Sequence, residues 1–275
     1  MNLNLEAADL YCRALTRRHY ENFSVASRFV DARTRRDLSR IYAYCRTTDD
    51  LGDESPGSSA LPRLERWRGE VEGLFGGTQP VHPVLFALAD TIERHAMTAR
   101  PFLDLITANV QDQVVKRYAT WDELIGYCRL SAAPVGRMVL SVFGVRGAGE
   151  ERLSDDVCIG LQLANHAQDV SRDEAMGRRY LVDGDVAAGG TAGAARAMVE
   201  RARTLLASAA ALERRVPRPL RLQLALYRMG GLAICDAIAA MGYKTEHERP
   251  SVSAPTKVSL VVRAALQTLA PGRLA

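Results

Sequence analysis

The sequence predicts an all-α fold, and three observations carry that prediction. Apolar residues recur every three or four positions, as in Leu38, Ile41, Tyr42 and Cys45, and this spacing places them on one face of a helix. Alternation with a period of two, which is typical of half-buried strands, is nearly absent. Hydrophobic residues make up 47% of the 275 residues and charged residues 25%, an ordinary globular composition. No linker-like break divides the chain, so we expect a single domain over residues 1–275.

Helix boundaries follow from proline and glycine. The turn cluster SPGSS at 55–59 ends the first long helix, and Pro101 stands where another begins. Pro134 interrupts a later apolar pattern, because proline removes a backbone hydrogen bond and kinks or ends a helix. A segment rich in Gly, Asp and Ala at 182–193 is expected to be a mobile loop. The predicted helices run from about 34 into the first acidic motif, over 60–74 and 83–97, from 101, from 120, and over 151–176, 194–215 and 218–241.

Charge and cysteine content exclude several classes of protein. Lys and Arg together number 36 against 32 Asp and Glu, a mild excess without the concentrated basic stripe of nucleic-acid binders. The five cysteines are scattered and lack C-x-x-C spacing, which argues against a disulfide framework and a zinc site. The N-terminus has no secretory pattern, and no apolar run approaches the roughly 18 residues of a membrane span. We therefore expect a cytoplasmic protein that does not bind nucleic acid.

The final segment, KVSLVVRAALQTLA at 257–270, is amphipathic. Packing against the core or a partner is the more common use of such a helix, and a peripheral contact with the inner membrane is the alternative. The sequence does not define an oligomeric state.

Two aspartate pairs, more than a hundred residues apart, carry the chemistry. Asp49 with Asp53, and Asp169 with Asp173, are each spaced i,i+4, which puts both carboxylates of a pair on one helix face. Two such helices facing each other would present four carboxylates to one site. Gathered like charges raise their pKa values or recruit cations, and all-oxygen ligands suit Mg²⁺, which bridges to substrate phosphates. The pairs therefore predict Mg²⁺-dependent chemistry on a diphosphate.

Uncharged hydrogen-bonding residues accompany the second pair. Asn165 precedes Asp169 by four residues and extends the face to an N-x₃-D-x₃-D pattern, which we call the acidic ladder (Asn165, Asp169 and Asp173). Gln162 and Gln168 stand beside it and fit metal-bound water or phosphate oxygen. His166 points roughly 100° away from Asn165 on a helix, so we expect a packed or exposed histidine and not a ligand.

The first motif is less specific by itself, because acidic helix ends are common on protein surfaces. Gly52 lowers helix propensity by up to about 1 kcal/mol relative to alanine, so it is expected to mark the fraying end of the helix. Asp49 should then be more firmly placed than Asp53. Arg46 lies seven residues before Asp53, close to two helical turns, and so falls near the same face.

Three segments resemble signatures of the squalene and phytoene synthase family, the head-to-head prenyl transferases. They are RIYAYCRTTDDLGDE (40–54), YCRLSAAPVG (127–136) and LQLANHAQDVSRDEAMGRRYL (161–181), and the likeness covers nearly the whole chain. The resemblance implies an isoprenoid-synthase fold, a single helical domain around a central cavity. It also implies an isoprenoid diphosphate as substrate and Mg²⁺ as cofactor. One departure is Val182, which follows Leu181 where the family commonly has proline.

The same resemblance assigns roles to individual residues. The four aspartates are implied to be catalytic, and with Asn165 they complete the implied Mg²⁺ ligands: Asp49, Asp53, Asn165, Asp169 and Asp173. Diphosphate contacts are implied for Arg46 and Tyr243, with Lys257 or Arg249 assisting at the same end. The implied cavity lining is Phe23, Tyr42, Tyr127, Val135 and Gly136. Gln162 and Gln168 complete the predicted substrate-binding set.

Within the family, four segments most resemble the bacterial hydroxysqualene synthases of the hopanoid pathway. They are YENFSVAS (20–27), 110–136, NHAQDV (165–170) and the tail GYKTEHERPSVSAPTKVSL (242–260). Gln168 distinguishes this branch, because presqualene diphosphate and phytoene synthases usually have arginine there. The branch ionises presqualene diphosphate and quenches the rearranged cation with water. The alternatives are synthesis of presqualene diphosphate, squalene or phytoene, and, outside enzymes, a non-catalytic assembly or lipid-binding relative.

Overall fold

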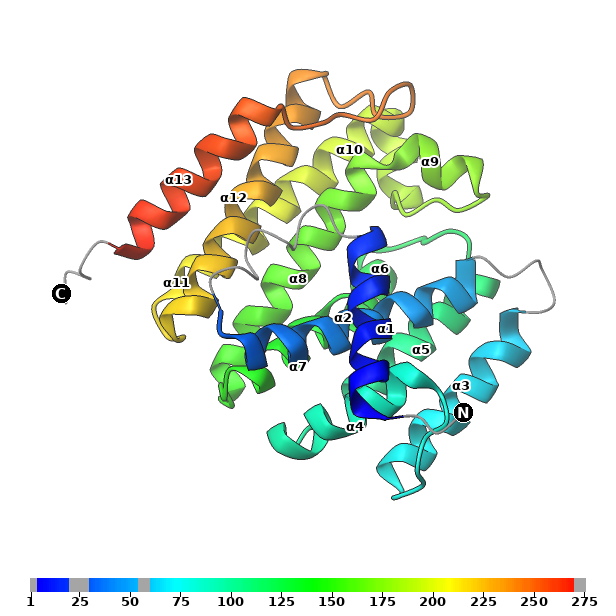
Figure 1. Cartoon of the computed structure of the whole chain (residues 1–275). Coiled ribbons are helices and arrows are strands. Elements are labelled where there is room, and N and C mark those ends of the chain that lie inside the picture. Colours follow the sequence, from blue (N-terminus) through cyan, green and yellow to red (C-terminus); the bar gives the residue numbers. More distant parts are fainter. Residues whose placement is uncertain (1–3, 20–29, 54–59, 270–275) are drawn as a thin grey trace. The chain divides into compact units, whose positions relative to one another are not determined.

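The computed structural model describes residues 4–19, 30–53 and 60–269. These residues form thirteen α-helices and one isolated β-bridge, between Arg117 and Arg179 (Figure 1). The all-α prediction is confirmed. The chain groups into two compact units: unit 1 comprises Met1–Val115 and Leu130–Gly147, and unit 2 comprises Lys116–Arg129 and Ala148–Ala275. The single domain over 1–275 stays a prediction.

Unit 1 is built around one long central helix. Its described helices are α1 (Leu5–His19), α2 (Ala32–Asp53), α3 (Ala60–Phe75), α4 (Pro83–His95), α5 (Arg100–Val114) and α7 (Ala133–Val142). The other five all pack against α2. Pro101 lies in the first turn of α5, as the sequence predicts, because a proline there removes no hydrogen bond from the helix. Pro134, predicted to kink or unwind a helix, lies in the first turn of α7, directly after the break at Ala132 that separates α7 from α6.

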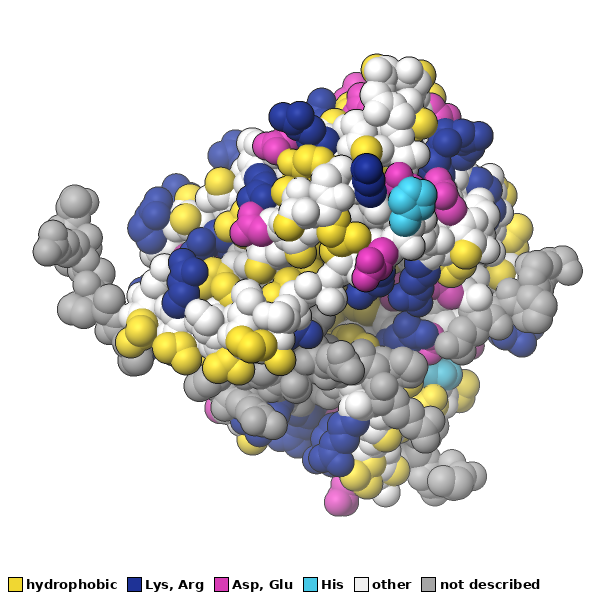
Figure 2. All heavy atoms as spheres, turned by 90° about the horizontal axis from the view of Figure 1, so that it is seen from above, with side chains coloured by type: hydrophobic (Ala, Val, Ile, Leu, Met, Phe, Trp, Pro, Cys, Tyr) yellow, Lys and Arg dark blue, Asp and Glu magenta, His cyan; other side chains and the backbone are white. Residues whose placement is uncertain are grey.

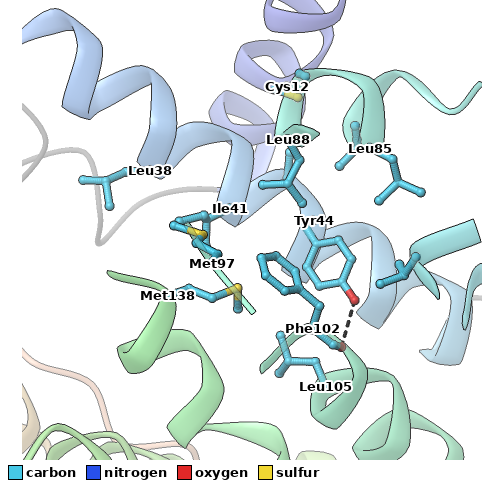
Figure 3. Packing of buried hydrophobic residues seen from close by; sticks show 14 of the residues in the cluster. Cys12, Leu38, Ile41, Tyr44, Leu85, Leu88, Met97, Phe102, Leu105 and Met138 are labelled. Atoms are coloured by element: carbon cyan, nitrogen blue, oxygen red, sulfur yellow. Dashed lines mark hydrogen bonds between the residues drawn. The ribbon is translucent and has the colours of Figure 1, made fainter. Parts of the chain in front are cut away.

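The aromatic core of unit 1 fixes α2 just before the first aspartate pair. The buried Tyr44 ring stacks on Trp67 of α3 at 5.8 Å between centroids. It also meets Phe102 of α5 edge-on at 5.1 Å (Figure 3). Its hydroxyl donates to the Phe102 carbonyl at 2.9 Å, and the Trp67 indole donates to Thr48 Oγ1 at 3.0 Å. Burying side chains of this size stabilises the fold by roughly 1.5–3 kcal/mol each. The turn that carries Asp49 is therefore anchored to two neighbouring helices.

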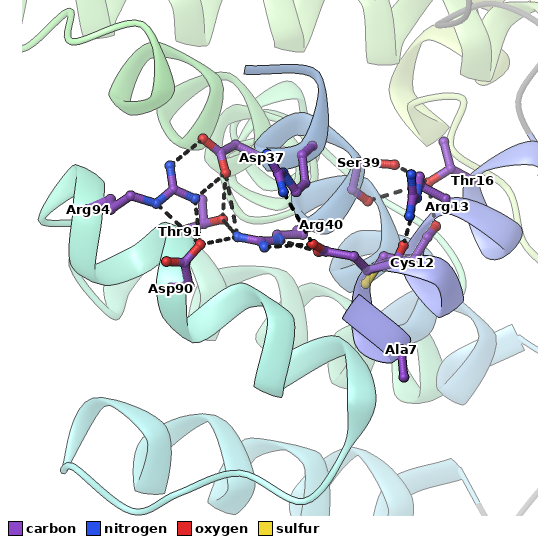
Figure 4. A network of polar contacts seen from close by, with 12 residues as sticks. Ala7, Cys12, Arg13, Thr16, Asp37, Ser39, Arg40, Asp90, Thr91 and Arg94 are labelled. Carbon is purple, nitrogen blue, oxygen red and sulfur yellow. Dashed lines mark hydrogen bonds and ion pairs between the residues drawn. The ribbon is translucent and has the colours of Figure 1, made fainter. Parts of the chain in front are cut away.

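Buried ion pairs hold the other half of α2 (Figure 4). The Arg40 side chain is 1% exposed. It donates through Nε and Nη2 to both carboxylate oxygens of Asp9 in α1, at 2.7 and 3.0 Å, and through Nη1 to Asp90 of α4 at 2.5 Å. Thr91 Oγ1 accepts from the same Nη1 at 3.0 Å. Arg40 is thus paired on two sides, which offsets the cost of burying its charge.

Asp37 stands one turn before Arg40 and is equally buried. Arg94 donates to both of its oxygens, at 2.6 and 2.8 Å, and His95 Nε2 lies 3.0 Å away. Burial by itself raises the pKa of Asp37, but the hydrogen bonds from Arg94, His95 and Thr91 outweigh it and hold that pKa below its ordinary value. The buried charges in this part of α2 are therefore each compensated by a partner of opposite charge.

Unit 2 consists of helices packed around α8. Most of α6 (Trp121–Ser131) belongs to it, together with α8 (Ala148–Gln168), α9 (Val170–Ala175), α10 (Asp183–Ala207), α11 (Ala209–Glu213), α12 (Arg218–Ala240) and α13 (Ala254–Leu269). Helices α10, α11 and α12 pack directly on α8. A Cβ on Gly231 of α12 would lie 2.9 Å from Leu161 of α8 and from Leu206 of α10, so glycine allows the three helices to approach closely.

Three predictions about unit 2 were wrong. The predicted helix 151–176 is interrupted at Asp169, which separates α8 from α9. The predicted loop 182–193 is helical and begins α10, with one break at Gly190, where φ is 66°. Asp185 in the first turn explains the helix start, because a carboxylate is favourable at a helix N-terminus and this one accepts a hydrogen bond from the Trp121 indole at 3.0 Å. The predicted helix 194–215 is divided into the end of α10 and α11.

One described helix, α12, has the length and composition of a membrane span. Its apolar window is 44% buried in the structure, and it packs against α8, α10 and α13. The core helix of a globular protein meets the same criteria, and these contacts are those of a core helix of unit 2.

Candidate functional site

The first aspartate pair lies on the last turns of α2, in unit 1. Asp49 is half-buried, and Asp53, one turn later, is exposed. Asn109 of α5 donates from Nδ2 to Asp49 Oδ1 at 3.2 Å and to the Leu105 carbonyl of its own helix at 3.1 Å. This amide fixes one oxygen of Asp49 and leaves the other to a ligand.

The electrostatics of this pair differ from those of Asp37. Burial raises the pKa of Asp49 to about 7; the Asn109 hydrogen bond and Arg46 lower it, while the charges of Asp53 and Asp50 raise it. Neighbouring cations are therefore insufficient to stabilise the charged form. A divalent cation bound to the carboxylate would supply the missing charge, and oxygen ligands of this kind suit Mg²⁺.

Gly52 has a role that the sequence did not reveal. A Cβ at this position would lie 2.6 Å from Asn109 Oδ1, so only glycine lets α5 come close enough for Asn109 to reach Asp49. Gln113, one turn further along α5, donates to the Gly52 carbonyl at 3.2 Å. Asn109 and Gln113 are positioning residues that the sequence analysis missed, because 60 residues separate Asn109 from the aspartate it holds.

Two other predicted site residues share α2 with this pair. Arg46 forms an ion pair with Asp50, one turn along the helix, and both side chains are about a quarter exposed. Tyr42 is half-buried, and burial raises its pKa, with Arg46 opposing and Asp49 adding to the shift. Tyr42, Arg46, Asp49 and Asp53 therefore lie on successive turns of one helix, as predicted.

The second pair lies at the junction of α8 and α9, in unit 2. Asp169 has φ −100° and ψ 18° and is the N-cap of α9, so the two helices are not continuous. The i,i+4 backbone bonds nevertheless persist: Asp169 N donates to Asn165 O at 2.9 Å, and Asp173 N to Asp169 O at 2.8 Å. The acidic ladder survives the break, with Asn165 exposed and both aspartates half-buried.

Gln168 ties the ladder to the chain segment after α12. Its side chain is buried; Nε2 donates to the Pro250 carbonyl at 2.7 Å, and Oε1 accepts from Arg249 at 3.3 Å. Arg249 also donates through Nε to Asp169. The structure thus joins Gln168 to the tail segment 242–260, which the sequence analysis singled out for separate reasons.

An aromatic cluster lies directly behind the ladder. The buried His166 ring stacks on Tyr180 at 3.8 Å, and Tyr180 stacks in turn on Tyr118 and Tyr127 at 5.9 and 5.5 Å. Of the two environments expected for His166, packed or exposed, the structure shows the packed one. Its Nδ1 nevertheless lies 3.9 Å from Asp173 Oδ2, so the histidine borders the ladder as well. Tyr118 and Tyr180 were missed because their stacking depends on tertiary contacts.

Comparison with known proteins decides the family. The sequence pattern described as squalene/phytoene synthase matches residues 16–256. The chain belongs to the squalene/phytoene synthase family. Among its relatives is a hydroxysqualene synthase from Rhodopseudomonas palustris, 40% identical over 166 residues that cover 58% of this chain and 54% of that protein. The match thus spans about half of that relative's length. A phytoene synthase from Arthrospira platensis is 34% identical over 193 residues, which cover 64% of this chain and 61% of that protein.

Solved structures agree with this family assignment. A squalene synthase, HpnC, from Alicyclobacillus acidocaldarius has a TM-score of 0.82 at 41% identity, covering 88% of this chain and 97% of that one. A dehydrosqualene synthase has a TM-score of 0.86 at 22% identity, covering 96% and 97% of the two chains, and shows the fold alone. The isoprenoid-synthase fold predicted from the sequence is confirmed.

The remaining predicted residues of this family member are distributed as follows. Phe23 lies outside the described residues. Val135 and Gly136 are half-buried on α7 of unit 1. Gln162 places its Nε2 3.1 Å from Nε2 of His166, within hydrogen-bond distance. Tyr243 follows α12 and is half-buried with φ 63°.

Each unit carries one aspartate pair, Asp49 with Asp53 in unit 1 and Asp169 with Asp173 in unit 2. Among the described residues, no three His, Cys, Asp or Glu side chains form a cluster that could hold a metal ion. The chemistry of the donors fits Mg²⁺: carboxylate oxygens, one amide oxygen at Asn165, and at Asp49 a carboxylate short of positive charge. That both pairs hold the same ions remains a prediction, as do the catalytic and substrate-binding roles of the other residues.

Proposed function

We propose that this chain is a Mg²⁺-dependent hydroxysqualene synthase, which converts presqualene diphosphate and water into hydroxysqualene and diphosphate. In the reaction the carbon–oxygen bond to diphosphate breaks, and its electron pair leaves with diphosphate. Water adds to the rearranged cation and loses a proton. No reductant enters this balance, so the proposed reaction needs no nicotinamide.

Gln168 is the observation that carries the proposal. Its carboxamide accepts from Arg249 and donates to the Pro250 carbonyl, so it uses both kinds of hydrogen-bonding group at once. Arginine has donors only, so it could not accept from Arg249 and would place a second cation beside the first. Gln168 and Arg249 therefore form a matched pair, which supports the hydroxysqualene synthase branch over the branches that usually have arginine at this position. Identities of 40% and 39% to two hydroxysqualene synthases support the same choice.

The other residues supply binding, orientation and exclusion of water. Asp49, Asp53, Asn165, Asp169 and Asp173 would hold Mg²⁺, which when bound acts as a Lewis acid on the diphosphate leaving group. Asn109 orients Asp49 for this role, and Gln168 and Arg249 orient Asp169. The stacked rings of Tyr118, Tyr127 and Tyr180 supply electron-rich faces that can replace water around a carbocation.

Squalene synthase activity is the second candidate. The solved structure with 41% identity is that of a squalene synthase, and phytoene synthases reach 34% identity. These reactions would use the same metal ligands and differ in substrate length and in the need for a reductant. The metal ligands therefore do not distinguish the candidate reactions, which must be distinguished by their products.

One assay tests the proposal. The purified protein with Mg²⁺ is offered presqualene, farnesyl and geranylgeranyl diphosphates separately, with and without NADPH, in ¹⁸O-water, and products are identified by mass spectrometry. We expect an ¹⁸O-labelled C30 alcohol from presqualene diphosphate without NADPH. Squalene formed only with NADPH, phytoene, or no labelled alcohol would each contradict the proposal.

A variant tests the role of Gln168 itself. Gln168→Arg should lower the yield of the alcohol and change the product ratio, whereas Gln168→Glu keeps the acceptor for Arg249 and should retain more of it. Gln267→Arg makes the same substitution at an exposed glutamine of α13 and is the control. Equal product ratios for wild type and Gln168→Arg would remove Gln168 as the deciding residue.

A further inference from the structure

Within the described part of unit 2, helix α13 packs on α12. Leu260, Ala264 and Thr268 recur every four residues on one side of α13; Ala264 and Thr268 are buried and Leu260 half-buried. Leu260 and Ala264 join a small hydrophobic cluster with residues of α12: Leu222, Ala225, Leu226 and Met229. This contact fixes the orientation of α13 and determines which side chains face outward.

A second apolar row runs along the outer side of α13. Val258, Val262 and Leu266 are 64%, 53% and 62% exposed, and their i,i+4,i+8 spacing places them on one face. In the space-filling view, hydrophobic side chains are exposed on the side of the molecule where α13 lies (Figures 1 and 2). We call these three residues the outer row. Scattered apolar residues on a surface are ordinary, but an aligned row on one helix marks a contact surface.

The charges on α13 indicate what this surface contacts. Lys257 precedes Val258 and Arg263 follows Val262; both are exposed, and the helix contains no acidic residue. A contact between two copies through the outer row would bring these cations together with no acid on either helix to offset them. Anionic lipid headgroups offset them directly, while the outer row enters the boundary between headgroups and acyl chains.

We propose that α13 is a docking surface for the face of a lipid bilayer that carries anionic headgroups. The helix lies on the membrane and does not cross it, because its inner side stays packed on α12. The outer row contains none of the residues assigned to chemistry, so the proposal does not depend on the proposed function.

Co-sedimentation with vesicles tests it. The full chain is mixed with vesicles of phosphatidylcholine alone or of phosphatidylcholine with about 30 mol% of an anionic phospholipid. The anionic phospholipid gives the vesicle a negative surface. We expect binding that is stronger to the anionic vesicles and weaker as salt is raised. The triple variant Val258→Ser, Val262→Ser, Leu266→Ser should bind roughly tenfold or more weakly, because three apolar side chains no longer enter the bilayer.

A matched triple variant distinguishes binding through the outer row from nonspecific adsorption by any exposed apolar side chain. Leu5→Ser, Leu10→Ser, Tyr11→Ser removes three exposed apolar side chains from α1 and should bind like the wild type. Arg263→Gln should weaken binding to anionic vesicles by roughly fivefold and leave binding to neutral vesicles unchanged. Circular dichroism confirms that each variant is folded.

Three outcomes would overturn the proposal. One is the absence of vesicle binding by the wild type, and another is unchanged binding by the folded outer-row variant. The third is a concentration-dependent dimer in sedimentation velocity that the outer-row variant abolishes while vesicle binding persists, which would assign the row to a second copy of the chain.

Discussion

Asp37 and Asp49 lie twelve residues apart on α2, yet their surroundings move their pKa values in opposite directions. Burial disfavours the charge of both. At Asp37, hydrogen bonds from Arg94, His95 and Thr91 outweigh burial and lower the pKa. At Asp49, the hydrogen bond from Asn109 and the charge of Arg46 do not outweigh burial, and the pKa rises to about 7.

The difference separates two uses of a buried carboxylate. A carboxylate surrounded by matching cations joins helices and has no affinity left for a ligand. A carboxylate placed among other carboxylates keeps a demand for positive charge, which a metal ion can meet. The ion pairs in the first half of α2 therefore serve stability, and we expect Asp49 in the second half to serve binding, so single substitutions should separate the two roles.

The largest effect is expected at Arg40. Arg40→Leu leaves Asp9 and Asp90 without their shared cation, and breaking a buried pair in this way costs roughly 3–5 kcal/mol in the free energy of unfolding. Urea denaturation measures it. The control is Arg36→Leu on the same helix, whose side chain is 48% exposed and 3.9 Å from Asp9, and which should change stability by no more than about 0.5 kcal/mol. Equal losses for the two variants would show that the network is not essential.

The next effect sets the two aspartates against each other directly. Asp49→Asn should lower activity roughly 100-fold without lowering stability, because it removes a proposed metal ligand and a poorly compensated charge. Asp37→Asn should lower stability by roughly 2–3 kcal/mol and leave the activity of the folded fraction unchanged. Steady-state kinetics and urea denaturation of both variants check this. A stability loss at Asp49 as large as that at Asp37 would erase the distinction.

A smaller effect is expected at Gly52. In Gly52→Ala the new methyl group displaces Asn109, and Asp49 loses its hydrogen bond, so activity should fall roughly tenfold. Gly69→Ala in α3 is the control, since a Cβ there meets nothing within 4 Å. Kinetics of the two variants decide whether Asn109 is a positioning residue; a fall of equal size in both would reject that role.

The smallest effect concerns acid stability. The folded-state pKa is lowered at Asp37, and lowered to about 2 at Asp90, where hydrogen bonds from Arg94 and Arg40 outweigh burial. Depressed carboxyl pKa values stabilise the fold above the unfolded-state value of about 3.9, and that stability is lost as pH falls toward 2. Asp37→Asn should therefore flatten the fall of unfolding free energy between about pH 4 and 2. A slope identical to that of the wild type would contradict it.

Local sequence information accounts for most of the fold. Apolar periodicity predicted most of the helices, Pro101 predicted the start of α5, and Pro134 marked a break in the apolar pattern, because these signals act within a few residues. The segment 182–193 was misjudged because its glycines favour a loop, whereas Trp121, about 60 residues earlier, pairs with Asp185 and stabilises a helix start. The break at Asp169 was also missed, since nothing in the local pattern weakens a helix there.

In the candidate site, too, local signals predicted some residues, and contacts that form only on folding concealed others. The aspartates, Asn165 and Gln168 were found because i,i+4 spacing and signature motifs are visible in the sequence. Asn109, Tyr180 and the contact of His166 with Asp173 were not, because each depends on residues brought together only by folding. The sequence thus predicted the residues that we expect to bind metal and substrate, but not the residues that orient them.

Isothermal titration tests the central claim, that both aspartate pairs bind Mg²⁺ together with a diphosphate. The wild type, Asp49→Ala and Asp169→Ala are each titrated with a non-hydrolysable diphosphate analogue in the presence of Mg²⁺, with Arg36→Leu as a control on α2. We expect tight binding by the wild type and the control, and at least a tenfold loss of affinity in each aspartate variant. No binding by the wild type, or equal binding by all four proteins, would contradict the claim.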